Sequence, residues 1–207
     1  MMLANWITLS RFPILAINIL VLFLASPPVR LAGVALLLIG LMLDTVDGVV
    51  ARKTKQTSLF GSVLDIAADR TYELALWVCF AYLRLIPVAI PVIVIARTTV
   101  TDAFRGIGVS HGTAPFKQHR TRLGQFLVGS TPMRVGYSVS KVVTFGGLAV
   151  VQACAGFPAD SKFAAVATQL MEPLRALAWV TVVLCVLRGL PVIIHGFKEY
   201  WGVADAA

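Results

Sequence analysis

Six long apolar segments, separated by shorter polar connections, restrict this chain to a membrane-spanning helical fold. A hydrocarbon core about 30 Å thick is crossed by about 20 helical residues, and each segment is close to that length. Inside a bilayer a segment must satisfy its own backbone hydrogen bonds, which an α-helix does. Divided at proline, glycine and charge clusters, the segments are 6–26, 29–50, 60–84, 87–108, 133–156 and 173–196. We therefore expect an all-α integral membrane protein with six transmembrane helices and a single domain over residues 1–207.

The composition agrees with a membrane protein and leaves no room for a separate soluble domain of any size. Hydrophobic residues make up 58% of the 207 residues, charged residues make up 14%, and the mean hydropathy is +0.84. Soluble domains carry about 25% charged residues. The first segment lacks a strongly basic start and is interrupted by Asn18, so we expect a retained helix and not a secretory signal. Cys79, Cys154 and Cys185 lie in apolar segments without CxxC spacing, which predicts buried free thiols.

Positive charge is concentrated in the connections between segments and sets the expected orientation. The formal net charge is +8. Because the basic residues lie between membrane segments, they indicate anionic lipid or phosphate partners and no nucleic acid. The denser set would lie on one side of the membrane: Arg52, Lys53, Lys55, Lys117, Arg120, Arg122, Arg134 and Lys198. The positive-inside rule makes this side and both termini cytoplasmic, which predicts a multi-pass protein of the cytoplasmic (inner) membrane.

Four aspartates stand in two pairs at the ends of the second and third segments: Asp44 with Asp47, and Asp65 with Asp69. Spacings of three and four residues place each pair on one face of its helix. The two helices are consecutive and antiparallel, so both pairs should meet at a similar depth near the cytoplasmic side. Carboxylates in apolar surroundings require a compensating partner. Hard divalent cations choose oxygen ligands, and two ions would balance four negative charges.

Other roles for the aspartates stay open at this point. They could form structural salt bridges with Arg52, Arg70 or Arg97, act as a proton relay, or line a cation path. Four acids at this spacing favour metal binding. Gly48 and Gly61 lie next to the acidic turns, where they favour a ligand pocket over simple helix packing.

The whole pattern D-x2-D-G-x2-A-R-x8-G-x3-D-x3-D resembles the signature of the CDP-alcohol phosphotransferase (CDP-alcohol phosphatidyltransferase) family of membrane enzymes. Every fixed position is met, by Asp44, Asp47, Gly48, Ala51, Arg52, Gly61, Asp65 and Asp69. The resemblance implies that the four aspartates hold two divalent ions, Mg²⁺ or Mn²⁺, at the cytoplasmic boundary. It implies that Asp69 is also the general base toward the acceptor hydroxyl. It further implies that Gly48, Ala51, Arg52 and Gly61 shape the CDP site, and that the protein is a homodimer.

Basic residues of the fourth and fifth segments would form a rim facing the aspartates across the cytoplasmic mouth. They are Arg97, Arg105, Arg134 and Lys141. Such a rim suits an anionic acceptor, such as a sugar or polyol phosphate. Arg105 could instead be an interface anchor, and Arg97 could pair with a motif aspartate or with a phosphate.

The N-terminal sequence N-W-I-T-L-S-R-F-P, residues 5–13, resembles that of bacterial phosphatidylglycerophosphate synthase-like members of the family. Asn5, Thr8 and Arg11 recur at i, i+3 and i+6, near one face of a helix. We expect Asn5 and Thr8 to contact the CDP group, or else to cap and anchor the first helix. This likeness favours glycerol 3-phosphate as acceptor. Thr98 and the single Lys141 depart from the subgroup pattern, so inositol phosphate or another polar alcohol stays open.

The resemblance implies a transferase of phospholipid biosynthesis. It would move a phosphatidyl group from lipid-linked CDP-diacylglycerol to a small polar, phosphorylated alcohol and release CMP. One alternative is transfer of a choline- or ethanolamine-type phosphobase from a CDP-alcohol to a lipid hydroxyl. That chemistry, however, needs no pocket that binds a phosphorylated, anionic acceptor. A second alternative is a divalent-cation transporter, although transporters are expected to carry acids on several helices at midplane depth.

Overall fold

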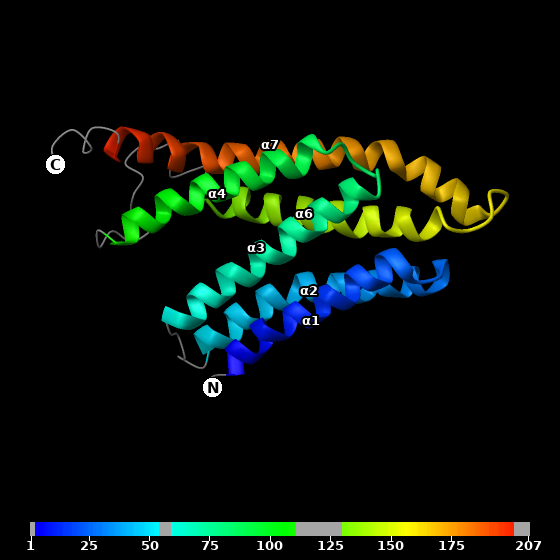
Figure 1. Ribbon diagram of the computed structural model, residues 1–207, viewed down its shortest axis with the longest axis horizontal. Coiled ribbons are helices and arrows are strands. Elements are labelled where there is room, and N and C mark those ends of the chain that lie inside the picture. Colours follow the sequence, from blue (N-terminus) through cyan, green and yellow to red (C-terminus); the bar gives the residue numbers. More distant parts are fainter. Residues whose placement is uncertain (1–2, 54–58, 111–129, 201–207) are drawn as a thin grey trace. The chain divides into compact units, whose positions relative to one another are not determined.

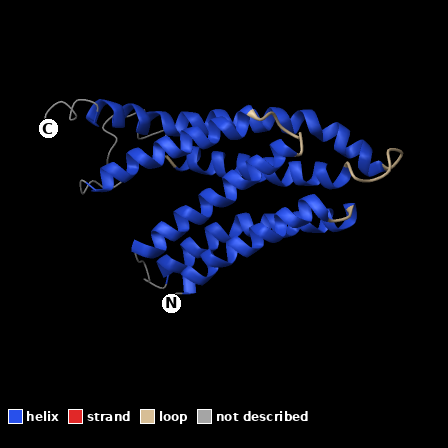
Figure 2. Ribbon diagram, viewed as in Figure 1, coloured by secondary structure: helices blue, strands red, loops and turns tan. Residues whose placement is uncertain are grey.

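The computed structural model describes residues 3–53, 59–110 and 130–200, and within them every regular element is an α-helix (Figure 1, Figure 2). In chain order the helices are α1 (Leu3–Leu24), α2 (Pro27–Lys53), α3 (Leu59–Tyr82), α4 (Ala89–Ser110), α6 (Thr131–Cys154) and α7 (Lys162–Tyr200). The all-α prediction is confirmed. The basic residues Lys55, Lys117, Arg120 and Arg122, which entered the orientation argument, lie outside the described residues.

Two serines explain where the last helices begin. Ser130 Oγ accepts a hydrogen bond from the Met133 amide at 3.4 Å, and Ser161 Oγ accepts one from the Ala164 amide at 3.1 Å. Both are N-cap interactions, in which a side-chain oxygen satisfies an amide of the first turn.

Two predicted helix boundaries were wrong. The predicted connection 157–172 is helical from Lys162, because Ser161 caps the helix and α7 continues through Pro173. Proline is tolerated inside membrane helices when neighbouring groups satisfy the freed carbonyl. The second helix extends to Lys53, so Arg52 is helical and not part of the following link.

Three helical stretches are long and apolar enough to cross a membrane, judged over the described ranges. They are Asn5–Leu24, Thr131–Cys154 and Lys162–Lys198. The side chains of α2 are described as far as Leu43, and Pro27–Leu43 is an apolar helical stretch. Helices α3 and α4 have 24 and 22 residues, which at about 1.5 Å per residue exceeds a 30 Å core. Six spans and the orientation of the termini stay predictions.

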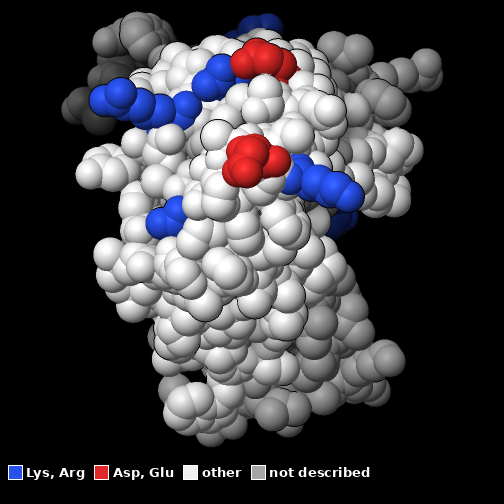
Figure 3. All heavy atoms as spheres, turned by 90° about the vertical axis from the view of Figure 1, so that its right-hand side faces the viewer, with Lys and Arg blue, Asp and Glu red and all other residues white. Residues whose placement is uncertain are grey.

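The surface carries rows of exposed apolar side chains, as expected of helices that face lipid. On α7 these are Val180, Val183, Leu187, Leu190 and Ile194, which recur every three or four residues and therefore share one helix face. Figure 3 shows a face of the molecule on which charged side chains are few. Large apolar surfaces of this kind are unfavourable in water, so they indicate that the helices lie in a membrane.

The chain divides into two compact units, each of which is described by itself. The first contains Met1–Pro87 and Val142–Ala176, and the second contains Val88–Lys141 and Leu177–Ala207. In the first unit α1 packs against both α2 and α3 (Figure 1). Its core includes Trp77, Phe80 and Phe145, with ring centroids of Trp77 and Phe145 4.8 Å apart in an edge-to-face arrangement. The three cysteines are buried and free, as predicted.

Arg175 of α7 donates hydrogen bonds to the turn that follows α3 in the first unit. The turn after α3 has hydrogen bonds from the Leu85 amide to Phe80 O and from the Arg84 amide to Ala81 O, which is the Schellman pattern. Arg84 has a φ of 59°, at the position where such turns favour glycine. Arg175 donates from Nε to Leu85 O at 2.9 Å and from Nη2 to Arg84 O at 3.3 Å. These contacts tie α7 to the end of α3 that lies away from Asp65 and Asp69.

Close approach of α2 to its neighbours depends on two glycines. A Cβ added at Gly33 would overlap Val21 Cγ1 of α1. A Cβ added at Gly40 would lie 2.7 Å from Cζ of Tyr72 on α3, and closer still to its hydroxyl. Tyr72 is buried, and its hydroxyl accepts a hydrogen bond from Asn18 Nδ2 of α1 at 2.9 Å. The three helices therefore meet around the Tyr72 ring.

Replacing Gly40 with alanine should destabilise the protein, because the new methyl group would push the Tyr72 ring out of its place between the helices. Overpacking of this kind costs about 1–3 kcal/mol in the free energy of unfolding. The measurement is the apparent melting temperature of the detergent-solubilised protein. The matched control is Gly136→Ala on α6, where nothing lies within 4 Å of the added Cβ. It should melt at or slightly above the wild-type temperature, since alanine is the better helix former. Equal melting temperatures for both variants would contradict the packing argument.

Candidate active site

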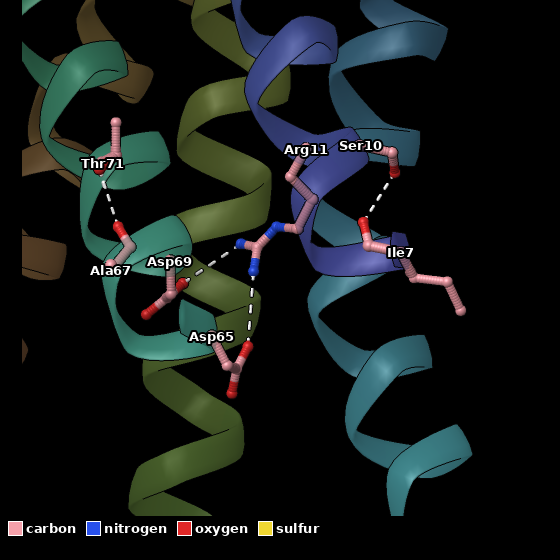
Figure 4. Close-up of polar contacts among 7 residues, drawn as sticks. All are labelled: Ile7, Ser10, Arg11, Asp65, Ala67, Asp69 and Thr71. Atoms are coloured by element: carbon pink, nitrogen blue, oxygen red, sulfur yellow. Dashed lines mark hydrogen bonds and ion pairs between the residues drawn. The ribbon is translucent and has the colours of Figure 1, made fainter. Parts of the chain in front are cut away.

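An arginine of α1 brings together the two aspartates of α3 (Figure 4). Arg11 Nη1 lies 3.7 Å from Asp65 Oδ1, and Arg11 Nη2 lies 3.7 Å from Asp69 Oδ1. The Arg11 side chain is 2% exposed, whereas those of Asp65 and Asp69 are 46% and 30% exposed. The guanidinium is therefore buried beneath two carboxylates that reach the surface.

The two carboxylates fit the ligand set expected for a divalent cation. Asp65 and Asp69 are four residues apart on one helix, so they share a face, as the sequence predicts. Figure 4 shows that the second oxygen of each carboxylate is directed away from Arg11, so the ion pairs do not use both oxygens. The two carboxylates carry two negative charges, of which the Arg11 guanidinium can balance one. Partly exposed anionic oxygens are the ligands that Mg²⁺ and Mn²⁺ prefer.

The first half of the motif lies on α2, the helix that precedes α3 in the chain. Asp44, Asp47, Gly48, Ala51 and Arg52 are helical, but their side chains lie outside the described part of the structure. Over the described side chains no group of three or more metal-binding residues is found, and two of the four predicted ligands are not among them. Gly61 lies in the first turn of α3, half-buried, one turn before Asp65.

Asn5 and Thr8 precede Arg11 on the same helix. Because α1 begins at Leu3, both lie within the helix and not at its N-cap, so the capping alternative is not supported. Thr8 is buried and Asn5 is half-buried. Their spacing of three residues places them, with Arg11, near one face of α1.

The sequence interpretation grouped Arg11 with Asn5 and Thr8, as nucleotide contacts or helix anchors, and did not pair it with the aspartates. The arginines considered as partners of the aspartates were Arg52, Arg70 and Arg97, but the ion pairs found at Asp65 and Asp69 involve Arg11. Arg70 lies 3.9 Å from Glu73, one turn away on its own helix. A signal was present in the sequence, because a lone arginine near the start of an apolar helix requires an anionic partner.

The second unit contains a cationic cluster around Tyr137 of α6. The Arg188 guanidinium lies 5.1 Å from the Tyr137 ring centroid, and Lys141 Nζ lies 5.6 Å from it. These distances are within the range of cation–π attraction. Lys141 was predicted from sequence, and Arg188 was not. Arg188 interrupts the apolar sequence V-T-V-V-L-C-V-L-R-G-L-P-V-I-I, residues 180–194, and an intramembrane charge of this kind indicates a functional site.

Two more of the predicted arginines adjoin this cluster. Arg97 of α4 packs over Gly189 of α7, where an added Cβ would lie 3.1 Å from Arg97 Cδ. Arg97 Nε and Arg188 Nε are buried, and neither has a hydrogen-bond partner within the described residues. Arg134 is exposed at the start of α6, three residues before Tyr137 on the same helix. The side chain of Arg105 lies outside the described part of α4. Converging cations with buried donors suit an anion.

Comparison with known proteins places this chain among membrane lipid enzymes. The sequence model of CDP-alcohol phosphatidyltransferase matches residues 1–154. A CDP-diacylglycerol–glycerol-3-phosphate 3-phosphatidyltransferase of Rickettsia bellii is 34% identical over 68 residues, which are 33% of this chain and 38% of the relative. A CMP-forming cardiolipin synthase of Streptomyces coelicolor is 35% identical over 85 residues, 40% of each chain. The matches thus span about two-fifths of these relatives. The family match covers most of the chain and includes the aspartate motif, so this protein belongs to the CDP-alcohol phosphatidyltransferase family.

Proposed function

We propose that this protein transfers the phosphatidyl group of CDP-diacylglycerol to a small phosphorylated alcohol and releases CMP. The observation that carries the proposal is the complete aspartate motif in a member of this family, with Asp65 and Asp69 side by side on α3. The two relatives, a CDP-diacylglycerol–glycerol-3-phosphate 3-phosphatidyltransferase and a CMP-forming cardiolipin synthase, agree with this donor and this product.

The reaction needs a nucleophile, a base and stabilisation of phosphate charge. An acceptor hydroxyl oxygen attacks the phosphatidyl phosphorus, the new P–O bond forms, and the bond from that phosphorus to CMP breaks. Asp69 takes the hydroxyl proton, and Asp44, Asp47, Asp65 and Asp69 would hold two Mg²⁺ or Mn²⁺ ions. Such ions, when bound, neutralise the pyrophosphate oxygens and favour departure of CMP.

The remaining motif residues would bind the nucleotide. Gly48, Ala51 and Gly61 are small enough for the CDP group to approach the backbone, and Arg52 offers a positive charge to its phosphates. Asn5 and Thr8 would contact CDP from α1, on the same helix face that carries Arg11.

The cationic cluster of the second unit supports a phosphorylated acceptor. Arg97, Arg134, Lys141 and Arg188 would bind the acceptor phosphate, with Arg105 as a further contact at the end of α4. Glycerol 3-phosphate is the favoured acceptor, because it agrees with the N-terminal likeness and with the Rickettsia bellii relative. Transfer of a phosphobase to an uncharged lipid hydroxyl would not need a cluster of cations to bind the acceptor, which disfavours the choline- or ethanolamine-type alternative.

The setting of the reaction follows from the donor and from the charge pattern. We propose six membrane spans, both termini in the cytoplasm, and an active site that faces the cytoplasm from the inner membrane. A homodimer is proposed from the family resemblance.

The reaction is tested by measuring CMP release from CDP-diacylglycerol by the purified protein in mixed micelles. Glycerol 3-phosphate should give the fastest release in a panel with inositol phosphate and phosphatidylglycerol, and release should require Mg²⁺ or Mn²⁺. Fastest release with another acceptor would overturn the acceptor assignment alone. Metal uptake into liposomes without CMP release from any acceptor would identify a transporter instead.

Replacing Asp69 with asparagine should lower kcat by at least about 100-fold, since general-base catalysis contributes about 10²–10⁴-fold. Stabilisation of the protein by Mn²⁺ should largely persist, because three aspartates remain and the asparagine keeps an oxygen. The readouts are CMP release at saturating substrates and the melting temperature with and without Mn²⁺. Asp160→Asn in the exposed connection before α7 is the matched control and should leave kcat unchanged. Turnover that survives in Asp69→Asn would rule out Asp69 as the base.

Replacing Arg188 with glutamine should raise the KM for glycerol 3-phosphate by about 10- to 100-fold, because a charge-assisted hydrogen bond is worth about 1.5–3 kcal/mol. The KM for CDP-diacylglycerol should stay near the wild-type value. Lys198→Gln, at an exposed position on the same helix, should change neither KM. If both KM values are unchanged in Arg188→Gln, the assignment of Arg188 to the acceptor site is wrong.

A further inference from the structure

Arg11 contacts the two α3 carboxylates through different nitrogens. Nη1 faces Asp65 and Nη2 faces Asp69, each at 3.7 Å (Figure 4). The two aspartates stand one helical turn apart, and a planar guanidinium presents its nitrogens in a fixed fork that can span them. An ammonium group has the same charge, but it is a compact point charge and cannot hold two carboxylates in one defined orientation.

The pattern of burial indicates more than neutralisation of a buried charge. One carboxylate would balance Arg11, yet two are held, and both remain partly exposed while Arg11 is 2% exposed. Each carboxylate turns its second oxygen away from Arg11 (Figure 4). The guanidinium therefore supports the carboxylates from the protein side and leaves their outer side accessible.

The Arg11 guanidinium also lies against the ring of Tyr72, which is itself fixed by its neighbours. The guanidinium carbon lies 5.8 Å from the Tyr72 ring centroid, within the range of cation–π attraction. Tyr72 in turn accepts the hydrogen bond from Asn18 and packs over Gly40 of α2. A long side chain fixed in this way loses little further freedom when the site binds a ligand, so the carboxylates are held in place beforehand.

We propose that Arg11 is a positioning residue, which holds Asp65 and Asp69 in the orientation needed to bind the divalent ions. This inference rests on the proposed function only in assigning metal to these aspartates. Residues that orient metal ligands without touching the metal contribute about 10- to 100-fold to metal affinity. Both the positive charge of Arg11 and the planar, two-pronged shape of its guanidinium should contribute to metal affinity.

The test compares Arg11→Lys and Arg11→Gln with wild type, using the full-length protein in detergent. Mn²⁺ is titrated while the melting temperature is recorded, which measures metal binding without turnover. CMP release is then measured over a range of Mn²⁺ concentrations. We expect the midpoint of the Mn²⁺ titration to rise by about 10-fold or more in both variants. At saturating Mn²⁺ the loss of kcat should be smaller in Arg11→Lys than in Arg11→Gln, and the KM for CDP-diacylglycerol should stay near wild type.

The matched control is Arg30→Gln, which removes another arginine that links α1 and α2. Arg30 Nη2 donates to Phe23 O at 3.1 Å, towards the opposite end of α1 from Arg11. This variant should lose some thermal stability but keep the wild-type Mn²⁺ midpoint. A purely structural role for Arg11 would give the same result in the Arg11 variants, namely a lower melting temperature with an unchanged midpoint, and would overturn the proposal.

Other outcomes are equally decisive. A lower Mn²⁺ midpoint in Arg11→Gln would mean that Arg11 competes with the metal, and a raised KM for CDP-diacylglycerol with an unchanged midpoint would mean that it binds substrate. Either result overturns the proposal, as does a wild-type protein that Mn²⁺ does not stabilise. Failure of the proposed function is seen separately, as absence of CMP release from a wild-type protein that Mn²⁺ does stabilise.

Discussion

The contact of Arg11 with Asp65 and Asp69 couples the packing of the first unit to its chemistry. A guanidinium buried among apolar helices requires anionic partners, and two neighbouring carboxylates require positive charge. Arg11 satisfies both requirements across the interface between α1 and α3. The Tyr72 ring, the Asn18 amide and the absence of a side chain at Gly40 allow this interface to close. Helix packing and the geometry of the acidic site therefore depend on the same residues.

Polar residues inside the helices are partnered in two ways. Small hydroxyls bond to the preceding turn of their own helix, as Ser10 does to Ile7 O, Thr71 to Ala67 O (Figure 4) and Thr101 to Arg97 O. These bonds satisfy the hydroxyl without a second helix. Arginines pair both ways: Arg70 lies near Glu73 on its own helix, whereas Arg11 and Arg175 reach groups beyond their own helix. Where such a contact joins two elements, it ties them together.

The predicted metal ligands Asp65 and Asp69 lie in the first unit, and the predicted acceptor-binding residues Arg97 and Lys141 lie in the second. In the first unit, partly exposed carboxylates gather at the start of α3. In the second, Arg97, Lys141 and Arg188 gather from α4, α6 and α7 around Tyr137 and Gly189. Half-buried cations that gather in this way repel one another, and a bound anion would reduce that repulsion.

The sequence alone determined the helices, the membrane class and the family. Hydropathy and helical spacing are local properties, and the aspartate motif is a short continuous pattern, so neither needs knowledge of the tertiary structure. Local signals were less reliable at Pro173, where a residue that disfavours helices lies inside α7.

The tertiary structure decided which charges meet. Arg11 pairs with Asp65 and Asp69, and Arg188 joins Lys141 at Tyr137, because of how helices distant in sequence pack and rotate against each other. Several arginines were equally plausible partners for the aspartates by charge alone. Side-chain contacts across helices depend on the rotation of each helix about its axis, and that rotation is set by packing at residues such as Gly40 and Tyr72.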